Sequence, residues 1–166
     1  GMLSTCNFTN NTANSGGGVW WNGTDGILAH SNFIDNKATN TNGGGVFWGG
    51  ANGMLSTCNF TNNAANSNSG GVEWSGANGR LTASTFINNA ANDGGAVGWG
   101  TANGILTNSS FIGNTAKTNG GGVFWGGING KLTGSTFSDN TATNGGGVYW
   151  LSANSTMADC NFIDNS

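Results

Sequence analysis

Carboxylates are the side chains of this chain that could most readily do chemistry, and one pair is placed to act together. Asp139 and Asp164 lie 25 residues apart in matching surroundings, each two residues after a phenylalanine, and Asp35 holds the same position earlier in the chain. If matching positions stack at the strand spacing, the two carboxylates would lie about 5 Å apart. Such a pair could bind calcium or share the acid and base roles of polysaccharide cleavage. We interpret it as a solvated turn, with an incidental calcium site or catalysis as alternatives.

Thiols and the imidazole are the other reactive groups, and their spacing predicts no catalytic or metal site. Cys6, Cys58 and Cys160 share one position two residues before a phenylalanine, and the single histidine, His30, stands apart from them. Cysteines two structural units apart would be separated by roughly 9 to 10 Å, beyond the reach of a disulfide. We predict three unpaired thiols, or an intermolecular pair at a terminal unit. We also predict no metal, no cofactor and no enzymatic activity.

Aromatic residues form the one pattern that could bind a sugar. A valine recurs along the chain with tryptophan two residues later, and the residue between them is aromatic in four copies. This intervening column reads Trp20, Phe47, Glu73, Gly98, Phe124 and Tyr149. If valine and tryptophan face inward, strand alternation places the column outside, where its rings could stack on sugars, bury against a neighbour or simply shield the sheet. In the inverse arrangement the recurrent tryptophans would lie outside and form the binding or assembly surface.

Asparagine is the polar residue that recurs most regularly along the chain, and its positions suggest two roles, one structural and one as a site of glycosylation. One asparagine lies three residues after each recurring phenylalanine, and an amide can both donate to and accept from the next amide in a column. We predict a structural asparagine ladder of Asn11, Asn36, Asn63, Asn89, Asn114, Asn140 and Asn165. Asn-x-Ser/Thr sequons make glycosylation a further expectation if the protein is exported by a glycosylating cell. These sequons begin at Asn7, Asn10, Asn22, Asn59, Asn108 and Asn154.

All these residues belong to an internal repeat, which fixes their positions relative to one another. Phenylalanine recurs every 25 to 27 residues, preceded five residues earlier by leucine or methionine. The recurring residues are Phe8, Phe33, Phe60, Phe86, Phe111, Phe137 and Phe162. A glycine cluster then precedes each recurring valine, and all variation in length falls in the polar stretch before these glycines. Variation confined to one place is typical of a loop outside a fixed frame.

The repeat predicts strands rather than helices, because glycine, asparagine, serine and threonine disfavour helix interiors. Asn-Gly pairs usually mark hairpins, but copies one unit apart require equivalent strands to pair in parallel. We therefore predict an all-β chain, a right-handed parallel β-helix (β-solenoid) of about 6.5 coils of 25–27 residues, as a single domain over residues 1–166. Leucine, phenylalanine, alanine, valine and tryptophan would stack inside, and the glycines before each valine would supply positive φ at a corner.

Charge is scarce, since only 7% of residues are charged and the formal net charge is -3. We expect Lys37, Arg80, Lys117 and Lys131 to occupy different positions of the repeat and to form no basic stripe, which argues against a nucleic-acid partner. Neither a signal peptide nor a transmembrane run is found. We expect the sequence to be a segment of a longer chain or fibre.

Two segments carry a resemblance to known families. Phe-x-x-Asn followed by Gly-Gly-Ala-Val, as at 86–89 and 94–97, resembles the repeats of chlamydial polymorphic outer membrane proteins. It is also similar to adhesin-like β-helical surface proteins of methanogenic archaea. The resemblance implies a right-handed β-helix displayed outside the cell and used for attachment. The chain departs from the chlamydial pattern by its column of tryptophans.

These observations predict a non-enzymatic, extracellular structural or adhesive protein of the cell surface, either an adhesin stalk or a fibre element. Its partners would be further copies, by head-to-tail or lateral stacking, or surface glycans. The alternatives are a carbohydrate-binding module that uses the aromatic column, and a polysaccharide lyase or hydrolase. Ice binding is disfavoured because the column before each phenylalanine does not give regular Thr-x-Thr rows.

Overall fold

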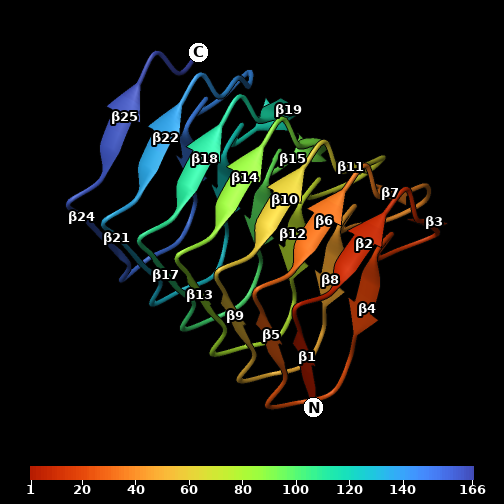
Figure 1. Cartoon of the computed structure of the whole chain (residues 1–166). Coiled ribbons are helices and arrows are strands. Elements are labelled where there is room, and N and C mark those ends of the chain that lie inside the picture. The colour runs from red at the N-terminus through yellow and green to blue at the C-terminus, as the bar shows by residue number, and fades with distance from the viewer.

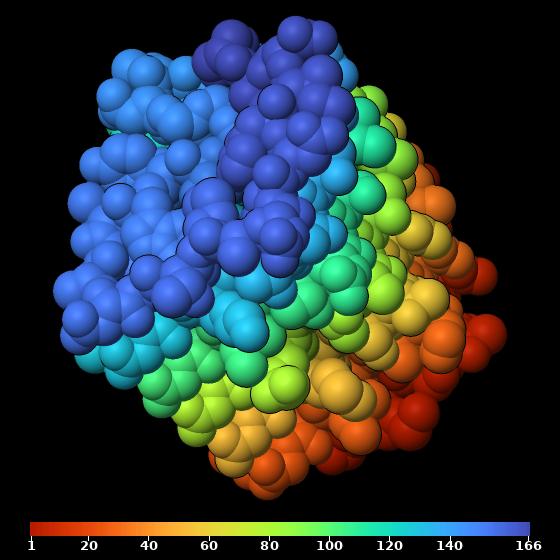
Figure 2. Space-filling model, turned by 90° about the vertical axis from the view of Figure 1, so that its left-hand side faces the viewer, coloured from red at the N-terminus to blue at the C-terminus, as the bar shows by residue number.

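Each copy of the repeat folds into one coil, and the coils stack along a single axis. The computed structural model describes residues 1–166, contains strands and no helix, and is the predicted β-solenoid. In Figure 1 the strands of the front sheet rise and those of the back sheet descend as the coils advance toward the C-terminus, which is a right-handed winding. At the surface the coils form successive coloured bands (Figure 2). No helix is long and apolar enough to cross a membrane.

Four parallel sheets run along the solenoid, each taking one strand from a coil. Sheet 1 contains β1 (Met2–Ser4), β5 (Ile27–Ala29), β9 (Met54–Ser56), β13 (Arg80–Thr82), β17 (Ile105–Thr107), β21 (Lys131–Thr133) and β24 (Thr156–Ala158). Sheet 2 contains β2 (Asn7–Thr9), β6 (Asn32–Ile34), β10 (Asn59–Thr61), β14 (Thr85–Ile87), β18 (Ser110–Ile112), β22 (Thr136–Ser138) and β25 (Asn161–Ile163). Sheet 3 contains β3 (Thr12–Ala13), β7 (Lys37–Ala38), β11 (Ala64–Ala65), β15 (Ala90–Asp93) and β19 (Thr115–Asn119). Sheet 4 contains β4 (Val19–Trp21), β8 (Val46–Trp48), β12 (Val72–Trp74), β16 (Val97–Trp99), β20 (Val123–Trp125) and β23 (Val148–Trp150).

The strands pair so that identical residues of successive coils lie side by side. Phe60, for example, pairs with Phe33 on one side and with Phe86 on the other. Every pairing is parallel, as the spacing of the copies predicted, so the Asn-Gly pairs are corners of a coil and not hairpin turns. Side chains alternate in each strand, which sends the recurring residues inward and their neighbours outward.

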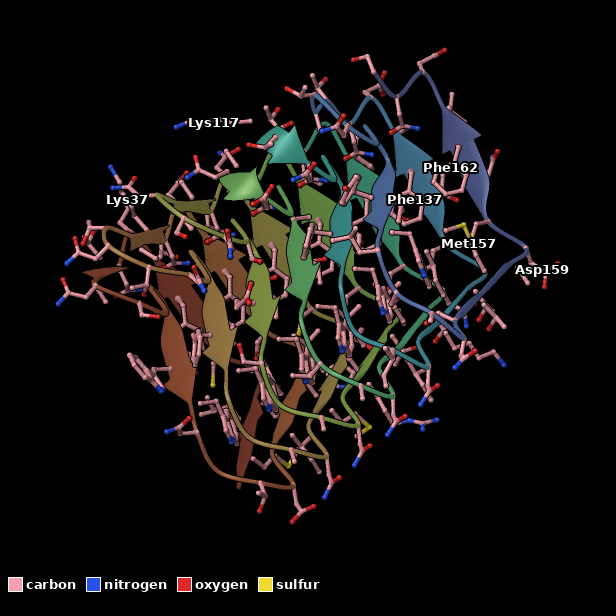
Figure 3. The ribbon with its side chains drawn as sticks, turned by 180° about the vertical axis from the view of Figure 1, so that it is seen from behind. Lys37, Lys117, Phe137, Met157, Asp159 and Phe162 are labelled. Carbon is pink, nitrogen blue, oxygen red and sulfur yellow. The ribbon has the colours of Figure 1, made fainter.

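The recurring apolar residues form continuous stacks inside the solenoid. The phenylalanine rings lie 4.6–4.9 Å apart between centroids and within 10° of parallel. Phe137 and Phe162 show this arrangement in Figure 3. The tryptophans stack equally well, with centroids 4.7–5.1 Å apart. Trp74 and Trp99 are fully buried, so the recurrent tryptophan column lies inside and the inverse arrangement is wrong.

The tryptophans fit inside because a glycine at the nearby corner leaves room for the indole edge. A Cβ atom added to Gly79 would overlap the indole of Trp74, and Gly26, Gly53, Gly104 and Gly130 stand in the same relation to the tryptophans of their own coils. Beside Trp150 the equivalent residue is Ser155. The left-handed backbone at this corner is carried instead by the preceding asparagine, Asn78, with φ of 59°. In the Asn-Gly pair, asparagine therefore adopts the left-handed conformation of the turn, and glycine leaves room for the tryptophan side chain.

The glycines before each valine act as predicted, with one exception. Gly94 has φ of 59°, and the next glycine, Gly95, has no room for a side chain because the backbone of the following coil lies against it. The first position of this cluster is glycine with positive φ in the other complete coils. In the third coil it is Ser69, which adopts φ of 62° without being glycine.

Candidate functional site

The outward column of sheet 4 is the candidate binding surface, and the structure divides it into two pairs of rings. Trp20 is 59% exposed and packs against Phe47 at 5.1 Å between centroids, with the ring planes tilted by 50°. Phe124 and Tyr149 are half-buried and stack at 5.8 Å with their planes 17° apart. Trp20 is therefore the most exposed of the four rings and the one most accessible to a ligand.

The two aromatic pairs are separated by a buried carboxyl group. Glu73 is only 8% exposed although its position in the strand is outward. The hydroxyl of Ser69 donates a hydrogen bond to Oε2 of Glu73. Burial raises the pKa of the Glu73 carboxyl to about 7, and hydrogen bonds from Ser69 and Ser75 oppose the shift. Sequence reasoning missed this group; the signal available was a serine at a position that is otherwise glycine.

The carboxylates singled out from the sequence lie on neighbouring coils at one corner. Asp139 and Asp164 follow β22 and β25, which are paired strands, and both side chains are exposed. Both residues have a left-handed backbone, with φ of 57° and 49°. The spacing argument thus placed them correctly, at a solvated turn. No three histidine, cysteine, aspartate or glutamate side chains are grouped to hold a metal ion.

The three cysteines hold the inward position that the repeat gives them, and all are free thiols. Cys58 is fully buried, and its thiol donates to the carbonyl oxygen of Ser56 at 3.2 Å. Burial raises the pKa of the Cys58 thiol. Cys6 and Cys160 lie in the terminal coils and are partly exposed. His30 is exposed at a corner and has φ of 49°.

The asparagine ladder is present and buried. Asn89 donates from Nδ2 to the carbonyl oxygen of Phe60 at 3.0 Å and to Oδ1 of Asn114 at 2.9 Å. Its own Oδ1 accepts the backbone N–H and the side-chain amide of Asn63, each at 3.0 Å. Each interior amide therefore joins its coil to both neighbours.

Six sequon asparagines are exposed, so their side chains are accessible to a glycosylating enzyme. They are Asn7, Asn10, Asn22, Asn59, Asn108 and Asn154. Asn59 also belongs to a short outward ladder, in which its amide donates to Oδ1 of Asn32 at 2.9 Å. Attachment of a glycan to the Asn59 amide would replace one of its two hydrogens and leave the other for this bond.

The basic residues are not all at different positions of the repeat, and that expectation was wrong for one pair. Arg80 and Lys131 both directly precede the inward leucine of sheet 1, so they share one outward column two coils apart, with Ile105 between them. Lys37 and Lys117 project from sheet 3 on another side of the solenoid (Figure 3).

Comparison with known proteins supports the likeness first seen in the sequence. Residues 134–149 match the Chlamydia polymorphic membrane protein repeat. In the structure this segment contains β22, with Phe137 of the inner stack, then Asn140 of the buried ladder and the glycines that lead to Val148. No curated protein and no solved structure matches the chain. The matched segment and the parallel β-solenoid together confirm that the chain carries β-helix repeats of this kind.

Proposed function

We propose that the chain is a non-enzymatic structural and adhesive element displayed on the outside of a cell, as a stalk or a fibre component. The carrying observation is that leucine, phenylalanine, valine and tryptophan stack without a break from coil to coil, together with the buried amides. Such a solenoid lengthens by one strand spacing, about 4.8 Å, with every added coil. The match to a repeat of a membrane protein supports a place at the cell surface.

Location is the first test of this proposal. Antibodies raised against the purified chain are applied to intact, unpermeabilised cells that produce it and are located by immunogold electron microscopy. A surface protein gives label on the outer face of intact cells, and the label is lost after mild external proteolysis. Label that is seen only after permeabilisation would overturn the proposal.

The partners we propose are further copies of the chain or surface glycans. In a fibre, solenoids would add to one another through strand pairing at their ends, because the outer strands present backbone groups along one edge. Negative-stain electron microscopy at increasing protein concentration distinguishes the modes: fibres that lengthen with concentration support assembly, and discrete rods support a stalk whose partner is a glycan.

Carbohydrate binding is the second candidate function, and the exposure of Trp20 favours it. An exposed indole offers a large apolar surface on which a sugar ring can stack. A glycan array probed with the wild-type chain and with Trp20→Ala tests this directly. A matched control is Ile112→Ala, which removes an exposed apolar side chain from sheet 2. Binding that is lost only in Trp20→Ala supports the second candidate, and binding that survives in both variants argues against it.

A further inference from the structure

The joint between the third and fourth coils differs from every other joint in sheet 4. The position after the recurring valine carries an aromatic ring elsewhere, but here it carries Glu73 in one coil and Gly98 in the next. The same third coil has Ser69 where the other complete coils have glycine. Three departures from the repeat therefore meet at one place.

The three residues fit one another. Glu73 and Gly98 are partners in the pairing of β12 with β16. A Cβ atom added to Gly98 would overlap both the Ser69 hydroxyl and Oε2 of Glu73, so the carboxyl group lies across Gly98 in the space that a side chain would occupy. The Ser69 hydroxyl donates to this same oxygen. The carboxyl of the third coil is thereby packed onto the backbone of the fourth.

No charge of the neighbouring strands offsets the buried carboxyl. The strands paired with β12 are β8 and β16, and neither contains a titratable residue. Asp93 in β15 accepts the backbone N–H of Ser69 through its carbonyl, while its carboxylate accepts hydrogen bonds from the next coil at Asn119. The polar partners of the Glu73 carboxyl are the hydroxyls of Ser69 and Ser75.

We propose that Ser69, Glu73 and Gly98 form a pH-responsive latch, which holds the third coil to the fourth when the Glu73 carboxyl is protonated and loosens when it ionises. In the protonated form a neutral group fills the gap between the two aromatic pairs. In the ionised form the carboxylate gains by leaving the gap for water. The outward column then carries a negative charge between Phe47 and Phe124, and Gly98 is uncovered.

The sign of the effect follows from burial. The pKa of Glu73 rises from 4.5 to about 7 in the folded chain, so the folded state holds more protons than the unfolded state between these values. Stability is then greatest below pH 4.5 and falls as the pH rises toward 7. Between pH 5 and pH 8 the linkage relation gives an increase of about 70-fold in the unfolding equilibrium constant from this one group.

The titration of Glu73 can be followed directly because it is the sole glutamate of the chain. Selective labelling with carboxyl-13C glutamate gives a single NMR signal, whose midpoint is measured between pH 4 and pH 9. Gly98→Ala pushes the flexible carboxyl out of the gap and moves the midpoint down toward 4.5. Gly100→Ala is the matched control, because a Cβ atom there meets nothing within 4 Å. Ser69→Gly removes a hydrogen bond that favours the ionised form, so it moves the midpoint up.

Chemical unfolding at pH 5 and pH 8 tests the coupling between titration and stability. The unfolding constant of the wild type rises with pH by about 70-fold more than that of Glu73→Gln, in which the group cannot ionise. Three results would each overturn the latch. They are a wild-type midpoint near 4.5, the same midpoint in Gly98→Ala as in the wild type, or the same pH dependence of unfolding in Glu73→Gln.

Discussion

Replacing one interior amide of the buried ladder should cost far more than replacing an amide of the outward ladder. Asn89→Ala removes the oxygen that accepts the backbone N–H and the side-chain amide of Asn63, each at 3.0 Å. The side chain of Asn89 is fully buried, so water cannot take its place without entering the core. Each stranded buried donor costs about 1 to 3 kcal/mol, and two donors therefore give a loss of about 4 kcal/mol in the free energy of unfolding.

The matched control is Asn32→Ala, in an amide ladder on the outer face of sheet 2. Asn32 donates to Asn7 at 2.8 Å and accepts from Asn59 at 2.9 Å, but these groups are accessible to solvent. Water replaces the lost bonds, and the expected cost is below about 1 kcal/mol. Both variants are unfolded in urea and followed by far-ultraviolet circular dichroism. If Asn89→Ala loses no more stability than Asn32→Ala, the buried ladder is not a principal source of cohesion between coils, and the reasoning fails.

Three further predictions concern corners and thiols. Gly79→Ala forces a Cβ atom into a buried indole and should lower the free energy of unfolding by about 1 to 3 kcal/mol, whereas Gly100→Ala, which points into open space, should leave the melting temperature nearly unchanged. Thr57→Gly relieves a β-branched residue at φ of 53° and should stabilise by about 0.5 to 1 kcal/mol after the entropy of glycine is subtracted; a lower urea midpoint would contradict this. Because burial raises the pKa of the Cys58 thiol, a thiol reagent at pH 8 should label Cys160 much faster than Cys58, and mass spectrometry of the labelled peptides distinguishes the two.

The fold could be predicted from the sequence because residues at the same position of successive repeats are the residues that pair between neighbouring strands. Phe60 aligns with Phe33 and Phe86 in the sequence, and the structure pairs the same residues in the same order. Side-chain direction was harder to predict. Valine and tryptophan alternate with a second set of aromatic residues, and the period of two is the same whichever set faces inward. What decides it is the corner glycine, such as Gly79 beneath Trp74, whose role depends on contacts across the coil.

The candidate site was only partly predictable. Trp20 and Phe47 are outward as expected, but the column is not one continuous platform, because Glu73 and Gly98 interrupt it. The sequence shows that Glu73 and Gly98 replace aromatic residues, but it does not show that the two residues contact each other. The missing information was that Ser69, four residues before Glu73, points its hydroxyl at the carboxyl, and that this group lies over a residue of the next coil. A contact between coils follows from three-dimensional register and not from local pattern.

The chain is rich in glycine and asparagine largely because the corners between its sheets need residues that adopt positive φ. Each complete coil turns at four left-handed positions, which glycine, asparagine and aspartate adopt at the least cost. The exceptions are Thr5, His30, Thr57, Ser69 and Ala83, and all but Ser69 fall at the single corner between sheets 1 and 2. That corner therefore tolerates strain, whereas the corner before sheet 4 accepts a residue other than glycine only where the serine binds Glu73. Since the coils are otherwise so alike, the latch is the place in sheet 4 where one coil matches its neighbour individually: the Glu73 carboxyl occupies the space that a side chain on Gly98 would fill, so it fits the glycine of the fourth coil.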